Sequence, residues 1–155
     1  MRYTLSILVQ NQSGVLSRVV SLFSRRGYNI DSLVVAPTED PTVSRMTICG
    51  QGDDYILEQM EKQLNKLVPV IKVRSLGENA VSSELMLVKI ACDTGQIGEL
   101  NEIAKLLGAE VVDVSPEAVV LRLAGDPQKC DTLYKLVKPF GVREVSRTGL
   151  IALEK

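Results

Sequence analysis

Residues 3–27 read YTLSILVQNQSGVLSRVVSLFSRRG, and three patterns follow one another in this stretch. Polar and apolar side chains alternate over residues 3–9, which predicts a half-buried strand. Residues 11–14 have the composition of a turn, and Ser13 is the candidate N-cap of the helix that follows. Apolar residues then recur at helical spacing until Gly27, the expected helix stop. The opening of the chain therefore predicts a strand, a turn and a helix in direct succession.

The same logic extends along the chain and repeats itself. After the first helix, the patterns predict strands over 30–36 and 43–49, a helix that begins at Asp53, and a strand over 70–73. A stretch rich in Gly, Asn and Ser follows, and then the order returns, with strands over 85–91, 110–114, 118–124 and 142–153 and helices over 97–107 and after Asp126. Both halves thus read strand-helix-strand-strand-helix-strand. This order predicts an α+β protein made of two ferredoxin-like βαββαβ modules.

The composition excludes several classes of function. The chain has 155 residues, 45% of them hydrophobic, with 18 basic and 19 acidic residues and a net charge of −1. No overall basic field exists to hold a nucleic acid or an anionic membrane surface, and no apolar stretch approaches the roughly 20 residues that cross a bilayer. His is absent altogether, which removes the commonest general base and metal ligand. The composition favours a soluble, cytoplasmic, non-catalytic protein without a nucleic-acid or membrane partner.

Three cysteines are present, Cys49, Cys92 and Cys130, and no Cys-x-x-Cys pair occurs among them. Each lies within an apolar pattern, so we expect buried thiols in a reducing compartment rather than a redox or metal site. The acidic pairs at 39–40 and 53–54 lie where loops and helix starts use such residues. They are expected to have no catalytic role.

The first turn is the candidate ligand site. It joins a strand end to a helix N-terminus, where free backbone N–H groups and the helix dipole can hold a carboxylate. Gly14 allows close approach to the backbone, and the side-chain carbonyl of Asn11 can accept from an ammonium group. An aliphatic side chain could be enclosed by neighbouring apolar residues, namely Val15, Leu16, Ile30 and Leu33. These parts suit a free branched amino acid. The alternative is that these residues, and Asn29 as well, serve only as ordinary turn and cap residues.

Blocks of this sequence resemble the small regulatory subunits of acetolactate synthase (acetohydroxyacid synthase). The resemblance is carried in the first module by residues 3–9, 11–19, 22–30, 33–38, 44–48 and 58–67, and in the second, more loosely, by residues 84–90 and 120–125. It implies an N-terminal ACT domain at 1–76, a linker at 77–83 and a C-terminal ACT-like, ferredoxin-like domain at 84–155.

What the resemblance implies about function is specific. Such a chain does no chemistry. It binds and activates a catalytic large subunit and confers feedback inhibition by L-valine or a related branched-chain amino acid. No cofactor is expected in this chain, while thiamine diphosphate, Mg²⁺ and FAD are expected on the catalytic partner. The effector would bind where two ACT domains form a homodimer, with Asn11, Gly14, Val15 and Leu16 from one domain and Asn29 and Ile30 from the facing one.

Two other hypotheses stay open at this point. One is a stand-alone ACT-type amino-acid sensor that controls a different target, which co-purification with a large thiamine-diphosphate enzyme would separate from a regulatory subunit. The other is a small acyl-phosphate hydrolase on a ferredoxin-like fold. That chemistry needs an arginine in the first loop, whereas Arg18 is predicted a full turn inside the helix.

Overall fold

The computed structural model describes residues 1–155, and its contacts divide the chain into two compact units. The N-terminal unit comprises residues 1–81 together with the last six residues, 150–155. The C-terminal unit comprises residues 82–149. The chain thus enters the C-terminal unit once and returns once.

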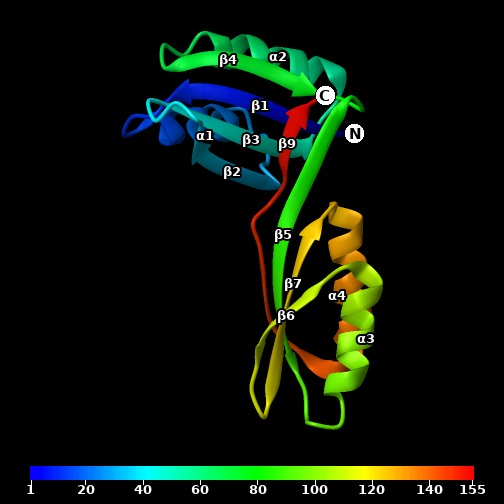
Figure 1. Ribbon diagram of the computed structural model, residues 1–155. Helices are drawn as coiled ribbons and strands as arrows, with labels where there is room; N and C mark the ends of the chain where they lie inside the picture. Colours follow the sequence, from blue (N-terminus) through cyan, green and yellow to red (C-terminus); the bar gives the residue numbers. More distant parts are fainter. The chain divides into compact units, whose positions relative to one another are not determined.

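The N-terminal unit contains the predicted six elements in the predicted order (Figure 1). These are β1 (Arg2–Gln10), α1 (Val15–Arg25), β2 (Ser32–Pro37), β3 (Val43–Gln51), α2 (Asp54–Asn65) and β4 (Val70–Leu76). The sheet order is β2-β3-β1-β4, and all three pairings are antiparallel. The ferredoxin-like prediction for this half is confirmed.

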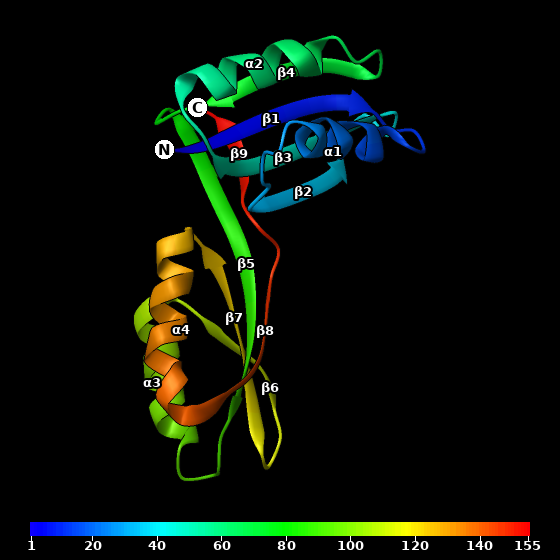
Figure 2. The same ribbon diagram turned by 180° about the vertical axis from the view of Figure 1, so that it is seen from behind.

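The core of this unit lies between the sheet and its two helices. Leu5, Ile7 and Val9 alternate along β1 and are almost completely buried, because successive side chains of a strand point to opposite faces. The buried residues of α1 recur every four positions, and those of α2 do the same, so each helix presents one apolar stripe. Both helices lie on the same face of the sheet, and the other face carries none (Figures 1 and 2).

The C-terminal unit repeats this topology. Its elements are β5 (Ala80–Ala91), α3 (Ile97–Leu107), β6 (Glu110–Val114), β7 (Ala118–Gly125), α4 (Pro127–Gly141) and β8 (Val142–Arg147). The sheet order is β6-β7-β5-β8, which matches that of the first unit element for element. Its separate core includes Leu100 from α3 and Leu133 from α4 against the central strands. The second ferredoxin-like module is therefore confirmed as well.

The boundary between the modules differs from the expected one. Only residues 77–79 separate β4 from β5, because β5 already begins at Ala80, inside the expected linker at 77–83. The last six residues also leave the C-terminal domain expected at 84–155: β9 (Ile151–Glu154) pairs with β5, and the Lys155 N–H donates to the Asn79 carbonyl at 3.0 Å. The composition of residues 77–83 favours turns. The pairing of β5 with β9, some 70 residues later in the sequence, outweighs this local preference and extends the strand.

The cysteines are all free, and two of the three are buried as expected. Cys92 and Cys130 lie in the C-terminal core. Cys49 is only half-buried, because its side chain points to the uncovered face of the first sheet, where it lies 3.6 Å from Thr4 Oγ1. None of the four helices combines the length and the apolar character that crossing a bilayer requires.

Candidate functional site

The turn between β1 and α1 leaves the start of α1 uncapped. The helix begins at Val15, and the preceding residue, Gly14, occupies the N-cap position with φ of 85°. No side chain accepts a hydrogen bond there, so the expectation that Ser13 caps the helix is wrong. Gly14 takes that place because the left-handed conformation favours a residue without Cβ. A Cβ built on Gly14 would meet no atom within 4 Å, so the space above it is open.

Several backbone N–H groups of this turn have no partner in the chain. Val15 donates weakly to the Gln12 carbonyl at 3.4 Å, and Arg18 donates to the Gly14 carbonyl at 3.1 Å. The N–H groups of the remaining turn and first-turn residues make no hydrogen bond to protein, namely Ser13, Gly14, Leu16 and Ser17. Such groups at a helix N-terminus carry partial positive charge and bind anions.

In the other three helices an acidic side chain offsets the partial positive charge of the N-terminus. Helix α1 has no such side chain. The Asp53 carboxylate caps α2 by accepting from the Ile56 N–H at 2.9 Å, and Asp126 caps α4 in the same way at 2.8 Å. Helix α3 has no side-chain cap but carries Glu99 in its first turn. Helix α1 has neither a cap nor an acid in its first turn, and Arg25 lies in its last turn. An external anion is therefore best accommodated at α1.

Asn11 is held in one orientation beside this helix start. Its backbone N–H donates to the Thr42 carbonyl at 2.8 Å, and its Nδ2 donates to the Pro41 carbonyl at 2.9 Å. Because a carbonyl oxygen can only accept, the amide group must turn its NH₂ toward Pro41. The Oδ1 atom makes no hydrogen bond within the chain and remains free as an acceptor.

The apolar lining of the site is smaller than expected. Val15 is only 4% exposed and packs in the core, so its side chain cannot contact a ligand, while its backbone stays in the turn. Leu16 is 42% exposed and supplies an apolar side chain at the helix start. A hollow of about 470 Å³ adjoins the turn and is lined by Gln10, Asn11, Gln12, Pro41, Thr42, Val43 and Ile71.

Asn29 and Ile30 lie away from this turn within one chain. They come just after α1. The next residue, Asp31, donates its N–H to the Cys49 carbonyl at 2.9 Å, and Cys49 pairs with Thr4 near the start of β1. The turn lies at the other end of β1, about 16 Å away along the 11-residue helix α1. Asn29 is exposed and donates to Asp31 Oδ1 at 3.0 Å, whereas Ile30 packs partly into the core. The structure thus brings together Asn11, Gly14 and Leu16, but not these two residues.

The acidic residues of the 38–42 loop and of the start of α2 make local hydrogen bonds. No group of three or more potential metal ligands comes together anywhere in the chain. Asp40 accepts hydrogen bonds from the Thr42 hydroxyl and N–H groups, at 2.7 and 2.9 Å, and these bonds lower the pKa of its carboxyl group. One acid of each pair, Asp40 in the loop and Asp53 at the start of α2, thus organises the local backbone.

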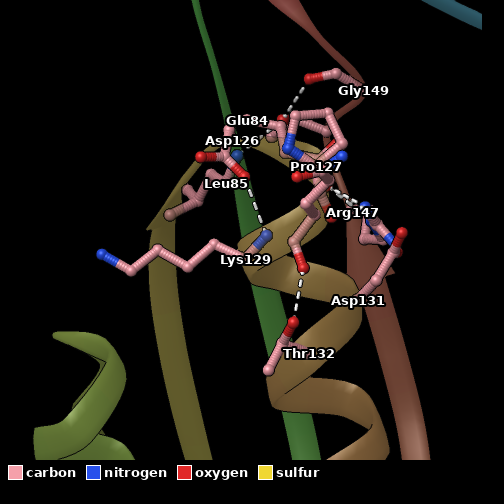
Figure 3. Close-up of polar contacts among 11 residues, drawn as sticks. Glu84, Leu85, Asp126, Pro127, Lys129, Asp131, Thr132, Arg147 and Gly149 are labelled. Carbon is pink, nitrogen blue, oxygen red and sulfur yellow. Dashed lines mark hydrogen bonds and ion pairs between the residues drawn. The ribbon is translucent and has the colours of Figure 1, made fainter.

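An ionic cluster around one buried carboxylate, that of Glu84, lies in the C-terminal unit (Figure 3). Glu84 of β5 is 7% exposed and accepts two hydrogen bonds from the guanidinium group of Arg147, one of them 2.7 Å long. Arg147 also donates to Asp131 of α4 at 2.6 Å and to the Pro127 carbonyl at 3.4 Å. The next residue, Thr148, exchanges two hydrogen bonds with Leu85. This cluster fastens β8 and α4 to β5, and we assign it a structural role.

Comparison with known proteins matches both halves of the chain. The family model described as "AHAS small subunit-like ACT domain" matches residues 5–72, and the model "Small subunit of acetolactate synthase" matches residues 83–155. The chain is 46% identical to the acetolactate synthase small subunit of Mycolicibacterium smegmatis, covering 99% of this chain and 91% of that one. It is also 46% identical to the acetolactate synthase isozyme 3 small subunit of Escherichia coli, covering 100% and 96%. The crystal structure of the acetolactate synthase small subunit from Thermotoga maritima superposes with a TM-score of 0.93 at 36% identity, covering 100% of this chain and 98% of that one.

Proposed function

Because the chain belongs to the family of acetolactate synthase small subunits, we propose that it activates a catalytic large subunit and makes it sensitive to feedback inhibition by L-valine. As a member of this family it is the regulatory subunit of the enzyme complex and not the catalytic one. With no His and no cluster of metal ligands, its own residues do not fit a catalytic metal site. We place thiamine diphosphate, Mg²⁺ and FAD on the large subunit.

The uncapped start of α1 is the observation that carries the proposal. An amino acid presents a carboxylate, an ammonium group and a side chain, and the turn offers a complement to each. The free N–H groups of Gly14, Leu16 and Ser17 would hold the carboxylate. Asn11 Oδ1 would accept from the ammonium group, and Leu16 would contact the aliphatic side chain.

A homodimer would complete this site with residues from a partner. Strand β2 is an edge strand, and its last residues, from Val35 onward, are exposed. If two β2 edges paired antiparallel across a two-fold axis, the start of one β2 would lie beside the end of the other. The end of β2, at Pro37, lies in the row of Ser44 and Val9, next to the turn. The segment with Asn29 and Ile30 of one chain would then approach the turn of its partner.

A shared site of this kind explains how a small effector could regulate a large assembly. Valine would stabilise whichever arrangement of the dimer holds both sets of residues together. It could shift the equilibrium only by its difference in affinity for the two arrangements. The large subunit would respond to that arrangement and not to valine itself.

Calorimetric titration with L-valine tests the site directly. We expect saturable binding to the parent chain and none to Gly14→Asp, which puts a carboxylate where the carboxylate of the ligand would lie. Gly14→Asn is the matched control, because Asn and Asp tolerate positive φ similarly and Asn carries no charge. Normal feedback inhibition in a holoenzyme containing Gly14→Asp would overturn the placement of the site. Failure of the parent chain to raise the activity of the large subunit would overturn the regulatory role.

A further inference from the structure

The face of the N-terminal sheet that carries no helix, and on which the end of β9 lies, holds its side chains in ordered rows. On this face Leu8 of β1 lies between Arg45 of β3 and Lys72 of β4, as the strand register requires. In the next row, Ser6 lies between Thr47 and Arg74. Because neighbouring strands are about 4.8 Å apart, the flanking residues on β3 and β4 are roughly 10 Å apart, with β1 as the floor.

These rows form a groove of about 330 Å³, which we call the basic groove. It is lined by Ser6, Leu8, Arg45, Lys72, Arg74, Leu76, Leu153 and Glu154. All eight residues belong to the N-terminal unit, the last two through β9. No helix of this unit lies on this face (Figures 1 and 2).

The groove is rich in hydrogen-bond donors and poor in acceptors. Arg45 donates from Nη1 to Ser6 Oγ at 2.8 Å, and neither Arg45 nor Lys72 has an acidic partner. Arg74 pairs with Glu154, which is the only carboxylate in the lining. Ser6 is 6% exposed and is held at the floor by Arg45, while its own hydroxyl hydrogen has no acceptor. Three cations facing one carboxylate leave the groove with an excess of two positive charges.

We propose that the basic groove docks an acidic segment of the catalytic large subunit, with a carboxylate group between Arg45 and Lys72. This inference rests on the proposed function and assigns part of the contact between the two subunits. The charge excess of the groove calls for an anionic partner, and the partly buried Arg45 is already positioned by Ser6. A width of roughly 10 Å accommodates one extended segment above the sheet.

The lining favours a peptide segment over a free phosphate. Three of the eight lining residues are leucines, Leu8, Leu76 and Leu153, which an inorganic anion would leave in water. Backbone N–H groups, which hold phosphate at helix N-termini, are committed here to the strand ladder. A segment that combines acidic and apolar side chains satisfies both parts of the groove.

The groove also lies close to the amino-acid site along the same strand. Asn11 follows Leu8 by only three residues, about 10 Å along the chain. A segment docked on β1 would therefore contact the strand whose end carries the effector turn. A change at the effector turn would therefore reach the docked segment through β1.

The experiment is reconstitution of the holoenzyme from full-length chains. The concentration of this chain that gives half-maximal activation of the large subunit is measured for the parent, Arg45→Gln, Lys72→Gln and Lys72→Glu. We expect Lys72→Glu to raise this concentration about tenfold and each Gln variant to raise it less. The effect of the Gln variants should shrink at 0.5 M salt, where charges are more strongly screened. Lys66→Gln, just after α2 on the helical side of the sheet, is the matched control and should behave like the parent.

The outcomes separate this inference from the function on which it rests. If the parent activates the large subunit and all three groove variants do so at the same concentration, the docking site is wrong and the regulatory role stands. Calorimetry could instead show saturable binding of inorganic phosphate to the groove, with the same half-maximal activating concentration for the groove variants as for the parent. The groove would then be a small-anion site, and the inference would again be wrong. L-valine binding to each variant, measured by calorimetry, should equal that of the parent. We interpret a variant that also loses valine binding as misfolded and set it aside. Lys72→Gln changes an exposed residue, so its half-maximal activating concentration then decides whether the groove docks the large subunit.

Discussion

Asn11 Nδ2 donates a hydrogen bond of 2.9 Å to the carbonyl oxygen of Pro41, so the turn before α1 and the loop between β2 and β3 are held together. The second bond between these segments, from the Asn11 N–H to the Thr42 carbonyl, is 2.8 Å long. The side chain of Asn11 is thereby positioned before any ligand arrives, which lowers the entropy cost of binding. Asn11 is thus a structural residue and a candidate ligand contact at once.

This double role makes Asn11→Ala informative. The variant removes the free Oδ1 acceptor and the bond to Pro41 together. We expect the affinity for L-valine to fall at least about tenfold, since a hydrogen bond to a charged group contributes about 1.5–3 kcal/mol. Calorimetric titration measures the change. Gln128→Ala, which removes an exposed amide on α4 in the C-terminal unit, should leave the affinity as it is, and an equal loss in both variants would argue against a specific contact by Asn11.

Asn29 tests whether the site is shared between two chains. Asn29→Ala should weaken valine binding while activation of the large subunit is retained, because the exposed side chain makes its one hydrogen bond within the chain to Asp31. Unchanged valine affinity would make Asn29 an ordinary turn residue.

A mixing experiment distinguishes a shared site from one built within a single chain. If Asn11→Ala and Asn29→Ala chains are unfolded together and refolded, half of the dimers should be mixed. In a mixed dimer, one of the two sites would combine intact Asn11 from one chain with intact Asn29 from the other. About a quarter of all sites should then regain the affinity of the parent. Absence of any regained binding in the mixture would contradict a site formed by two chains.

The local patterns predicted the elements well because each element is decided mainly by its own residues. Helix starts at Asp53 and at Asp126 were predicted from the sequence, and in the structure both carboxylates cap the helices that follow them. Alternation along residues 3–9 placed β1 correctly, because one buried face imposes a period of two. The turn at 11–14 has free N–H groups, as expected where a strand is followed directly by a helix, while its role as a ligand site stays a prediction.

The features that the sequence predicted wrongly, or did not predict, are of two kinds. Some depend on contacts with segments distant in sequence, and others on which of two adjacent residues takes a given position. Ser13 was preferred over Gly14 as the cap because serine has a capping side chain, whereas the backbone here requires positive φ. Val15 was expected to line the ligand site, but the stripe it shares with Val19 and Phe23 turns it into the core. No local signal linked Pro41 to Asn11 or β9 to β5, because both contacts join parts of the chain far apart in sequence.

Gly50 is predicted to be intolerant of any side chain. A Cβ at this buried position would lie 2.4 Å from Tyr3 Oη and 3.0 Å from the Asn29 carbonyl oxygen. Gly50→Ala should therefore destabilise the protein by about 1–3 kcal/mol, as overpacked cores do. Urea unfolding measures the change.

Tyr3→Phe provides the matched test of this contact. The Tyr3 hydroxyl is buried without a hydrogen-bond partner, so its removal alone should cost little stability. In the double variant Gly50→Ala/Tyr3→Phe the nearest clashing atom is gone, and part of the lost stability should return. Additive effects of the two changes would show that the Tyr3 hydroxyl is not the cause, because the ring carbon Cζ, 2.7 Å from the added Cβ, is still present in phenylalanine.

Arg147 is predicted to stabilise the C-terminal unit far more than a surface arginine. Arg147→Ala would leave the buried Glu84 carboxylate without its partner, and losses of this kind cost about 3–5 kcal/mol. Arg122→Ala is the control, because its pair with Glu110 is exposed and worth at most about 1 kcal/mol. Replacing both partners, as in Glu84→Leu/Arg147→Met, should cost less than Arg147→Ala alone. Equal unfolding midpoints in urea for Arg147→Ala and Arg122→Ala would refute this ranking.

Cys130 is predicted to make the protein less stable at alkaline pH. Burial, and after it the neighbouring Glu84 carboxylate, raises the pKa of its thiol from 9.0 to about 11. Below pH 9 the thiol is protonated in both the folded and the unfolded chain, so it adds no pH dependence there. Between pH 9 and 11 the unfolded chain releases the proton while the folded chain retains it. Stability should therefore fall across this window, by at most about 1.4 kcal/mol per pH unit for this single proton.

Urea unfolding of the parent and of Cys130→Ala between pH 8 and 11 checks this assignment. The variant lacks the thiol, so its stability should fall less steeply over the window even if the small cavity makes it less stable at pH 8. Some slope should persist, because burial also raises the pKa values of Cys92 and Tyr3 in the same direction. Parallel curves for the two proteins would mean that the Cys130 thiol loses its proton as readily in the folded chain as in the unfolded one.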